Sequence, residues 1–374
     1  MTDEPAARVS STGSVSPPIA MLAELTHRCP LACPYCSNPL ELTTRESELD
    51  TATWSRVLAE AAALGVLQVH LSGGEPAARR DLTEIVRSAR DAGLYVNLIT
   101  SGIGINEARL SALDAAGLDH IQLSLQGTSA EVADRIGGYD GGFERKLAFA
   151  RWVEARGIPL TVNAVMHREN LDDLPQMIDM ALALGARRIE VACVQFYGWG
   201  LRNRAALQPS REQVACAKTV VEDARTRLRR RLAIDFVPPD YYADYPKACM
   251  GGWGSTGLNI APNGAVLPCH AAGTIPGLSF PNVMDMPLAD IWHSSPAFAA
   301  FRGTDWMPEP CRSCARRDID HGGCRCQAMA LTGDPTATDP VCRKSPHRGL
   351  VDEILAREQL APDSRPAFVM RRYQ

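Results

Sequence analysis

Three cysteines near the start of the chain are spaced to bind an iron–sulfur cluster. Cys29, Cys33 and Cys36 form a C-x3-C-x2-C pattern. Three thiolates on one short loop can each hold one iron of a four-iron cluster, which leaves the fourth iron open to chelate a small molecule. A structural zinc site would need a fourth protein ligand, for which this loop offers only His27. The spacing therefore predicts a cluster with an open iron, with zinc as the alternative.

A second motif, Gly73-Gly74-Glu75, forms a turn after a short apolar run. Glycines allow a backbone to approach a ligand closely, and a carboxylate can pair with an ammonium group. Such a turn is weak evidence when it stands alone. Downstream of the cysteine triplet, it strengthens the prediction that a small molecule binds at the open iron.

The two motifs together resemble the radical SAM superfamily, whose members bind S-adenosylmethionine (SAM) at the open iron of a [4Fe-4S] cluster. Tyr35, directly before the third cysteine, fits this resemblance. The resemblance implies that Cys29, Cys33 and Cys36 hold the cluster. It also implies that Gly73, Gly74 and Glu75 touch the methionyl amine of SAM. The remaining cofactor-binding candidates are Tyr35, Ser101, Ser124, Gln126 and Arg135.

Seven more cysteines lie in the last third of the chain: Cys249, Cys269, Cys311, Cys314, Cys324, Cys326 and Cys342. Their spacing resembles the SPASM domain, an extension of some radical SAM enzymes that binds two auxiliary iron–sulfur clusters. Asp320 stands where that pattern has a cysteine, and the extra cysteine that many relatives carry between Cys249 and Cys269 is missing.

The SPASM resemblance implies two sets of ligands. Cys249, Cys269, Cys324 and Cys326 would hold the cluster nearer the first site, as [2Fe-2S] or [4Fe-4S]. A distal [4Fe-4S] cluster would be held by Cys311, Cys314, Asp320 and Cys342. An aspartate ligand is unusual because thiolate is the softer match for iron. The alternative is that Asp320 flanks the site and His321 or water binds.

Alternating strand and helix signals indicate how the first site is positioned. Apolar runs at 19–25, 67–71, 94–100, 121–125, 160–165 and 189–194 predict strands, and helical stripes separate several of them. This order predicts right-handed βαβ units, a parallel sheet and a partial (β/α)6 barrel. The candidate residues follow strand ends, where parallel folds gather their chemistry. We interpret His167, after the fifth strand, as an ordinary loop residue.

The expected domains follow from a change in the sequence pattern after residue 200, where the alternating strand and helix signals give way to a charged helix and then to irregular segments. Residues 1–17 are expected to be a disordered lead-in, and 18–235 the barrel with a linking helix at 211–231. Residues 236–347 form the cysteine-rich SPASM domain, with a hairpin at 262–264, and 348–374 form a C-terminal helix and tail. Irregular chain buries little apolar surface, so bound metal is expected to stabilise the SPASM region.

Composition limits the function further. The chain has a net charge of -4, which gives no basic footprint for nucleic acid. It has no run of ~20 apolar residues for a membrane span and no signal peptide, so we expect a cytoplasmic protein. Twelve cysteines in a reducing compartment favour metal binding over disulfides. Cys193 and Cys216, outside both groups, are expected to be small buried residues.

Longer motifs resemble the PqqE family, the radical SAM enzymes of pyrroloquinoline quinone biosynthesis. They lie at 195–200, 249–254, 305–311 and 322–328, and the resemblance runs from 18 to 347. It implies that a radical made from SAM takes a hydrogen from a glutamate γ-carbon in the precursor peptide PqqA, and that this carbon joins a tyrosine ring. The implied partners are PqqA, the peptide-presenting protein PqqD and an electron donor such as flavodoxin.

Three other functions are alternatives. Another SPASM peptide maturase, of the sulfatase or thioether-forming type, would fit the superfamily but not Asp320. A non-catalytic iron–sulfur electron carrier would not need the glycine motif, and a zinc-scaffold binding module would hold no iron. Aromatic residues suit either peptide docking or core packing: Tyr241, Tyr242, Tyr245, Trp199 and Trp253.

Overall fold

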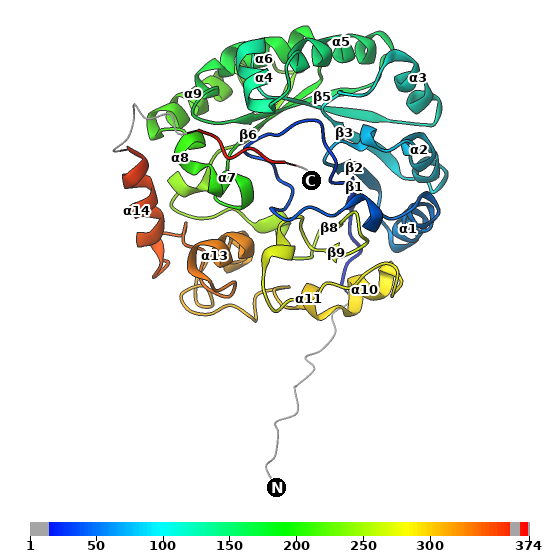
Figure 1. Cartoon of the computed structure of the whole chain (residues 1–374). Helices are drawn as coiled ribbons and strands as arrows, with labels where there is room; N and C mark the ends of the chain where they lie inside the picture. The colour runs from blue at the N-terminus through cyan, green and yellow to red at the C-terminus, as the bar shows by residue number, and fades with distance from the viewer. Residues whose placement is uncertain (1–14, 360–366, 373–374) are drawn as a thin grey trace.

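In the computed structural model of the chain, residues 15–359 and 367–372 are described. Their strands form one curved sheet of nine strands in the order β7-β6-β5-β4-β3-β2-β1-β8-β9. Figure 1 shows the curved sheet, with the C-terminal segment, drawn in red, lying inside its curve. Most of the expected lead-in, residues 1–14, lies outside the described residues.

Six strands confirm the predicted parallel sheet. They are β1 (Ala20–Thr26), β2 (Gln68–Gly73), β3 (Tyr95–Thr100), β4 (His120–Leu125), β5 (Leu160–Met166) and β6 (Arg188–Cys193). Three more strands join this sheet. β7 (Ala233–Val237) was not predicted, whereas β8 (Gly257–Ile260) and β9 (Val266–Leu267) flank the predicted turn at 262–264. β7 and β8 extend the parallel sheet at its two edges, while β8 and β9 form the expected antiparallel hairpin.

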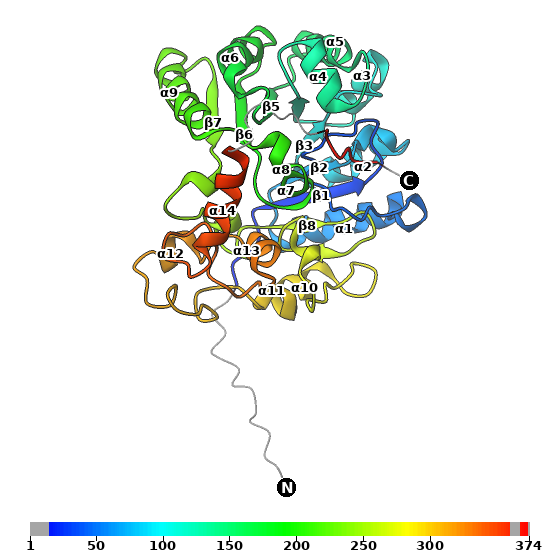
Figure 2. The ribbon, with the colours of Figure 1, turned by 60° about the vertical axis from the view of Figure 1, so that its left-hand side comes forward.

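Helices cover the outer face of the sheet, as Figures 1 and 2 show. They are α1 (Thr51–Leu64), α2 (Leu82–Asp91), α3 (Glu107–Ala115), α4 (Ala130–Gly137), α5 (Gly142–Ala155), α6 (Leu174–Ala183) and α9 (Arg211–Arg227). The limits of α1 are set by its capping residues. Asp50 accepts a hydrogen bond from the Thr53 backbone N–H at 2.8 Å, and Gly65 ends the helix with φ of 110°.

Shorter elements build the rest of the molecule. α7 (Gly198–Arg202) and α8 (Arg204–Leu207) follow β6, and α10 (Leu288–Ser294) and α11 (Pro296–Ala299) follow the β8–β9 hairpin. α12 (Arg317–Asp320) and α13 (Arg325–Thr332) lie among the late cysteines, and α14 (Arg348–Gln359) is the expected C-terminal helix. No helix in the described part of the chain is long and apolar enough to span a membrane.

The expected boundary between residues 235 and 236 does not separate two domains in the structure. It falls inside β7, and β8 pairs with β1 in the same sheet. Trp292 and Phe298, from beyond the boundary, are fully buried in the main core. The SPASM region therefore closes one edge of the barrel instead of standing apart from it.

The two cysteines outside the groups differ from each other. Cys193, at the end of β6, is buried as expected. Cys216, on α9, is exposed, so the prediction for this residue is wrong. α9 packs on the sheet through Ala217, Val221 and Ala224, and position 216 falls outside this buried stripe.

Candidate active site

The first cysteine loop begins directly after β1, at the carboxyl end of the sheet. Cys29, Cys33 and Cys36 are partly buried and line a cavity of about 180 Å³. The other walls of this cavity come from the ends of β2, β3, β4 and β5. The candidate residues therefore lie at the carboxyl ends of the strands, as predicted.

Neighbouring elements hold the cysteine loop by its backbone. The Glu75 N–H, after β2, donates to the Arg28 carbonyl at 2.8 Å. From α7–α8, the Asn203 side-chain amide donates to the Pro34 carbonyl at 2.8 Å. Because these bonds come from opposite sides, the loop is fixed before any ligand binds.

The two glycines are needed for packing as well as for ligand approach. A Cβ on Gly73 would lie 2.3 Å from the Thr26 carbonyl oxygen, and one on Gly74 would lie 2.4 Å from that of Arg28. Gly73 also has φ of 119°. Both glycines still line the cavity, so their backbone is available to a ligand there.

Glu75 lies behind the cavity wall, because it is fully buried but is not one of the lining residues. One carboxylate oxygen accepts from the Thr100 hydroxyl at 2.7 Å and the Ala77 N–H at 3.0 Å. The other accepts from the Ser101 N–H at 2.7 Å and hydroxyl at 2.5 Å. These four bonds use the lone-pair sites of the carboxylate. Its contact with the SAM amine therefore stays a prediction, and the geometry favours Gly73 and Gly74 for that contact.

The structure brings most of the other cofactor candidates to the cavity and leaves one out. Tyr35, Ser101, Ser124 and Gln126 all line it. Arg135 does not: it is exposed on α4 and forms an ion pair with Glu169.

Burial dominates the electrostatics of this site. It raises the pKa of Cys29 to about 12 and that of Cys33 to about 11, and it raises the pKa of Cys36 as well. Thiols in such a place ionise when a metal takes the place of the proton. Two buried cations that the sequence did not reveal act against the rise in the pKa of Cys33, namely Lys146 and Arg371. Lys146 donates to the Gln126 side chain.

The cavity has the polar groups that a charged ligand would need. Among the described residues, the buried Asn163 Oδ1 and Arg371 Nε have no hydrogen-bond partner. Both residues line the cavity. Buried polar atoms without partners are costly, so these two indicate a polar ligand beside the cysteines. His167, whose pKa burial lowers to about 3, is packed near the Tyr35 ring and does not line the cavity.

Four late cysteines meet as predicted, next to the barrel. The Sγ atoms of Cys269 and Cys326 are 3.7 Å apart. Cys249 and Cys324 complete a ring in which each thiol contacts two others. Asp339, fully buried, fixes this ring by accepting a hydrogen bond from the Cys324 N–H at 2.7 Å.

The second predicted set also comes together. Cys311, Cys314, Asp320 and Cys342 line one small cavity, which His321 does not line. Two other polar groups reach the sulfurs there: Lys344 lies 3.4 Å from the Cys314 Sγ, and Thr338 lies 3.4 Å from the Cys311 Sγ.

The late cysteines are not arranged around single ions. Within the described ranges, no three His, Cys, Asp or Glu side chains converge as ligands of one metal ion. Cysteines of a cubane each hold a different iron and need no common point.

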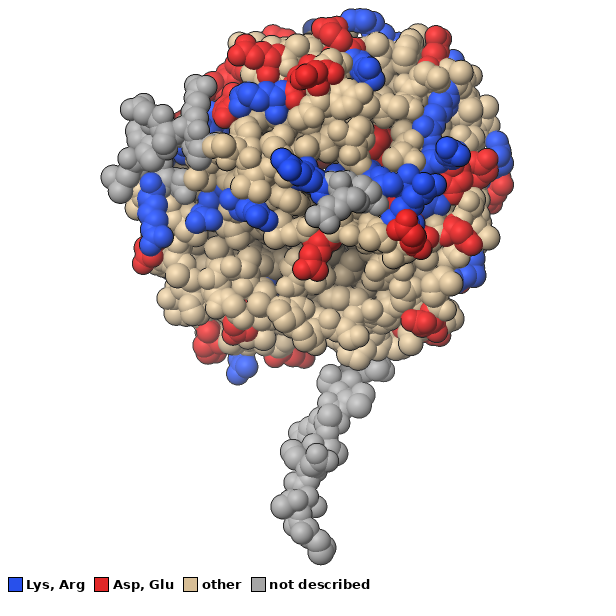
Figure 3. All heavy atoms as spheres, viewed as in Figure 1, with Lys and Arg blue, Asp and Glu red and all other residues tan. Residues whose placement is uncertain are grey.

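A larger cavity of about 800 Å³ joins the two cysteine regions. Ser37 and Asn38, next to the first loop, line one part, and Cys326 lines another. Tyr197 and His270 project between them, 3.4 Å apart at their polar atoms. In the view of Figure 3, which is that of Figure 1, Lys and Arg side chains flank the centre of the molecule. The surface below the centre is mostly uncharged.

Core packing explains three of the aromatic residues. Tyr241, Trp199 and Trp253 are buried, and Tyr241 stacks on Phe196 at 4.2 Å between ring centroids. They are therefore not available for docking a peptide.

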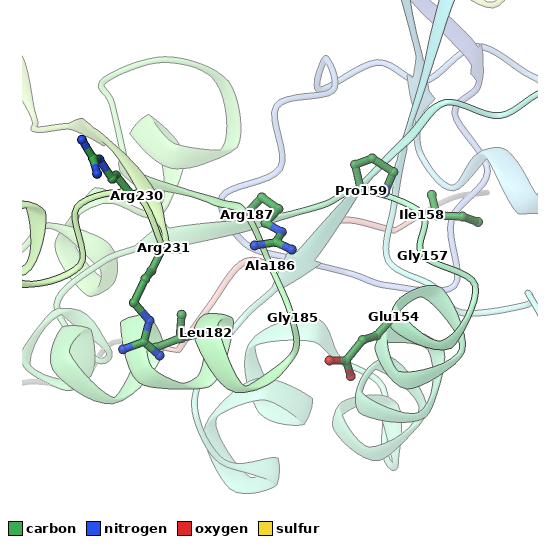
Figure 4. Close-up of a pocket in the computed structure, with 10 residues that line it drawn as sticks. All are labelled: Glu154, Gly157, Ile158, Pro159, Leu182, Gly185, Ala186, Arg187, Arg230 and Arg231. Carbon is green, nitrogen blue, oxygen red and sulfur yellow. The ribbon is translucent and has the colours of Figure 1, made fainter.

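A separate hollow of about 430 Å³ lies at the amino ends of β5 and β6, shown in Figure 4. Pro159 and Arg187, which directly precede these strands, line it together with Glu154, Arg230 and Arg231. The cysteines lie at the opposite strand ends, so this hollow is not part of the site.

Comparison with known protein families matches both parts of the chain. Residues 23–181 match the radical SAM superfamily, and residues 249–315 match the SPASM iron–sulfur cluster-binding domain. The chain is 69% identical to a PqqA peptide cyclase of Ruegeria pomeroyi over 342 residues, which is 91% of each chain. It is 60% identical to that of Rhizobium meliloti, over 99% of this chain and 97% of the relative.

Solved structures share the fold at low identity. Streptococcus suis SuiB bound to S-adenosylmethionine matches 88% of this chain and 78% of its own, with a TM-score of 0.73 and 20% identity. The enzyme anSMEcpe with bound AdoMet matches 92% of this chain and 94% of its own, with a TM-score of 0.62 and 15% identity.

Proposed function

Because the chain belongs to the PqqA peptide cyclases, radical SAM enzymes that carry a SPASM domain, we propose that it joins a glutamate γ-carbon to a tyrosine ring in the peptide PqqA. This would be an early step of pyrroloquinoline quinone biosynthesis. The carrying observation is the cavity of about 800 Å³ that reaches from the first cysteine loop to Cys326. A peptide segment held there would lie between the two redox sites.

Residues at the barrel mouth would hold the first cofactors. Cys29, Cys33 and Cys36 would bind a [4Fe-4S] cluster, and the backbone of Gly73 and Gly74 would contact SAM. The other proposed contacts are Tyr35, Glu75, Ser101, Ser124, Gln126 and Arg135. When bound, the cluster and SAM supply a carbon-centred radical that can take a hydrogen atom from an unactivated carbon.

The chain itself would orient the peptide and exclude water. One hydrogen atom leaves the glutamate γ-carbon, the carbon–carbon bond forms, and the ring loses a proton and an electron, so the product lacks two hydrogens. An electron acceptor must then lie close to the ring. Cys326, which lines both the cavity and the cysteine ring, supports an acceptor at this place.

The proposed auxiliary ligand sets are supported by the proximity of the side chains within each group. We assign Cys249, Cys269, Cys324 and Cys326 to a [2Fe-2S] or [4Fe-4S] cluster, and Cys311, Cys314, Asp320 and Cys342 to a distal [4Fe-4S] cluster. The Asp320 carboxylate is available because its side chain is only partly used, accepting from the Gly322 N–H at 3.2 Å and from Arg316 at 3.3 Å. Unchanged cluster spectra in Asp320→Cys would contradict its role as a ligand.

Two further partners are proposed from family membership alone. PqqD would present the peptide, and a flavodoxin-type protein would deliver the electron.

Mass spectrometry of PqqA tests the proposed reaction. The peptide is incubated without oxygen with this protein, PqqD, SAM and a reductant. The expected product has lost two hydrogens and carries a Glu–Tyr link. SAM cleavage with unchanged peptide would contradict the substrate, and intact clusters without SAM cleavage would favour the electron carrier.

A further inference from the structure

The last described residues, 367–372, lie inside the curve of the sheet (Figure 1). Val369 is fixed at both of its backbone groups by the side chain of Asn203, at 2.7 Å and 3.0 Å. The Arg371 N–H donates to the Ala32 carbonyl, inside the first cysteine loop, at 3.2 Å. The C-terminal segment is therefore tied to the loop that carries Cys29, Cys33 and Cys36.

Arg371 points into the protein and is only 2% exposed. Its guanidinium donates to the His27 carbonyl, while Nε has no hydrogen-bond partner among the described residues. No carboxylate in the described ranges lies within ion-pair distance of it. A buried cation without a counter-ion is strongly disfavoured, so its position indicates an anion that the protein chain does not supply.

The cysteines are the groups that face this cation. Arg371 lines the same cavity as Cys29, Cys33 and Cys36. Of the acidic groups nearby, Glu75 is already satisfied by four hydrogen bonds from the chain.

We propose that Arg371 is the buried counter-charge of the cluster held by the first three cysteines, and that its Nε–H donates to a sulfur of that cluster. The inference rests on the proposed function, since it needs the cluster. Reduction adds negative charge, and both a nearby cation and a hydrogen bond to sulfur favour the reduced form. Arg371 thus acts as a positioning residue that raises the reduction potential of the cluster.

The test is an EPR-monitored redox titration of the full chain with its clusters reconstituted, carried out without SAM. Adding SAM to an aliquot identifies the first cluster as the one whose signal shifts. Arg371→Gln is expected to lower the reduction equilibrium constant about tenfold, which is about 59 mV for one electron. Arg372→Gln, at the exposed neighbouring position, is the matched control and keeps the wild-type potential.

Arg371→Lys keeps the charge but lacks the Nε donor, so it is expected to shift the potential in the same direction by less. It also decides the matter if Arg371→Gln fails to load iron. An unchanged potential in an iron-loaded variant overturns the proposal, even if SAM affinity falls, because the cation would then serve the SAM carboxylate. If SAM shifts no signal in the wild type, the proposed function fails instead.

Discussion

The two cysteine regions differ in what holds them in place. The first loop lies on the ends of long parallel strands that share a large apolar core, with fully buried residues such as Leu25 and Trp54. The late cysteines lie on short helices and turns around a small core that includes Trp253 and Phe301. From this difference we expect that metal bound at the first site would serve the chemistry, whereas metal bound at the second site would stabilise the fold.

The largest expected effect is on activity and leaves the fold intact. Cys33→Ser should abolish SAM cleavage, because the cluster loses one of its three thiolates, yet thermal unfolding should stay close to wild type. Anaerobic assay of 5′-deoxyadenosine, together with circular dichroism, checks both. Cys216→Ser, at an exposed cysteine outside both groups, should keep full activity. A large fall in melting temperature for Cys33→Ser would break the comparison.

A change beside the first loop should act on activity through position. In Gly74→Ala the new Cβ would lie 2.4 Å from the Arg28 carbonyl oxygen, so the loop must shift. A displacement of about 1 Å at a reacting centre costs about a hundredfold in rate. SAM cleavage rates measure the loss. Gly349→Ala, where a Cβ meets nothing within 4 Å, is the control, and equal rates for the two variants would contradict the account.

At the late cysteines, the same kind of substitution should act on stability. Cys269→Ser removes one thiol from the ring of four cysteines. The Sγ atom of Cys269 lies 3.7 Å from that of Cys326. We expect the free energy of unfolding of the SPASM region to fall by about 2 kcal/mol or more, as when a structural metal is lost. Hydrogen exchange should show faster exchange in residues 249–345 than in the barrel strands. Equal protection in Cys269→Ser and Cys33→Ser would contradict the comparison.

The smallest effect concerns the barrel at acid pH. Burial lowers the pKa of His167 to about 3, below its ordinary 6.5. Below pH 6.5 the unfolded chain therefore binds a proton that the folded chain does not, and stability falls by about 1.4 kcal/mol per pH unit. His167→Asn should flatten this slope between pH 6.5 and 5 in urea unfolding. His293→Asn, at an exposed position, is the control and should follow the wild-type curve. An unchanged slope in His167→Asn would contradict the assignment of this pH dependence to His167.

The sequence predicted the strands that are apolar and long. β1 to β6 are such runs, whereas β7 carries Asp235 in its middle and β9 has two residues. These edge strands take their structure from pairing with the sheet, which local patterns do not reveal.

Within the candidate site, spacing was enough to group Cys29, Cys33 and Cys36, because one short loop carries all three. The two late sets join residues that are far apart in the sequence, so their grouping came from the resemblance to the SPASM domain.

Spacing could not place Arg135, whose direction on α4 is set by its pairing with Glu169. Nor could it find Arg371, which contacts a loop 344 residues earlier in the chain. Contacts of this length depend on the fold as a whole.

The central claim is that this protein takes a hydrogen atom from the glutamate γ-carbon of PqqA. The most direct measurement uses PqqA with deuterium at that carbon, incubated with the reconstituted protein, PqqD, SAM and a reductant. The account predicts that one of the two γ-deuteriums appears in 5′-deoxyadenosine and that the linked peptide keeps only the other. Linked peptide that keeps all of its deuterium, with none in 5′-deoxyadenosine, would contradict it.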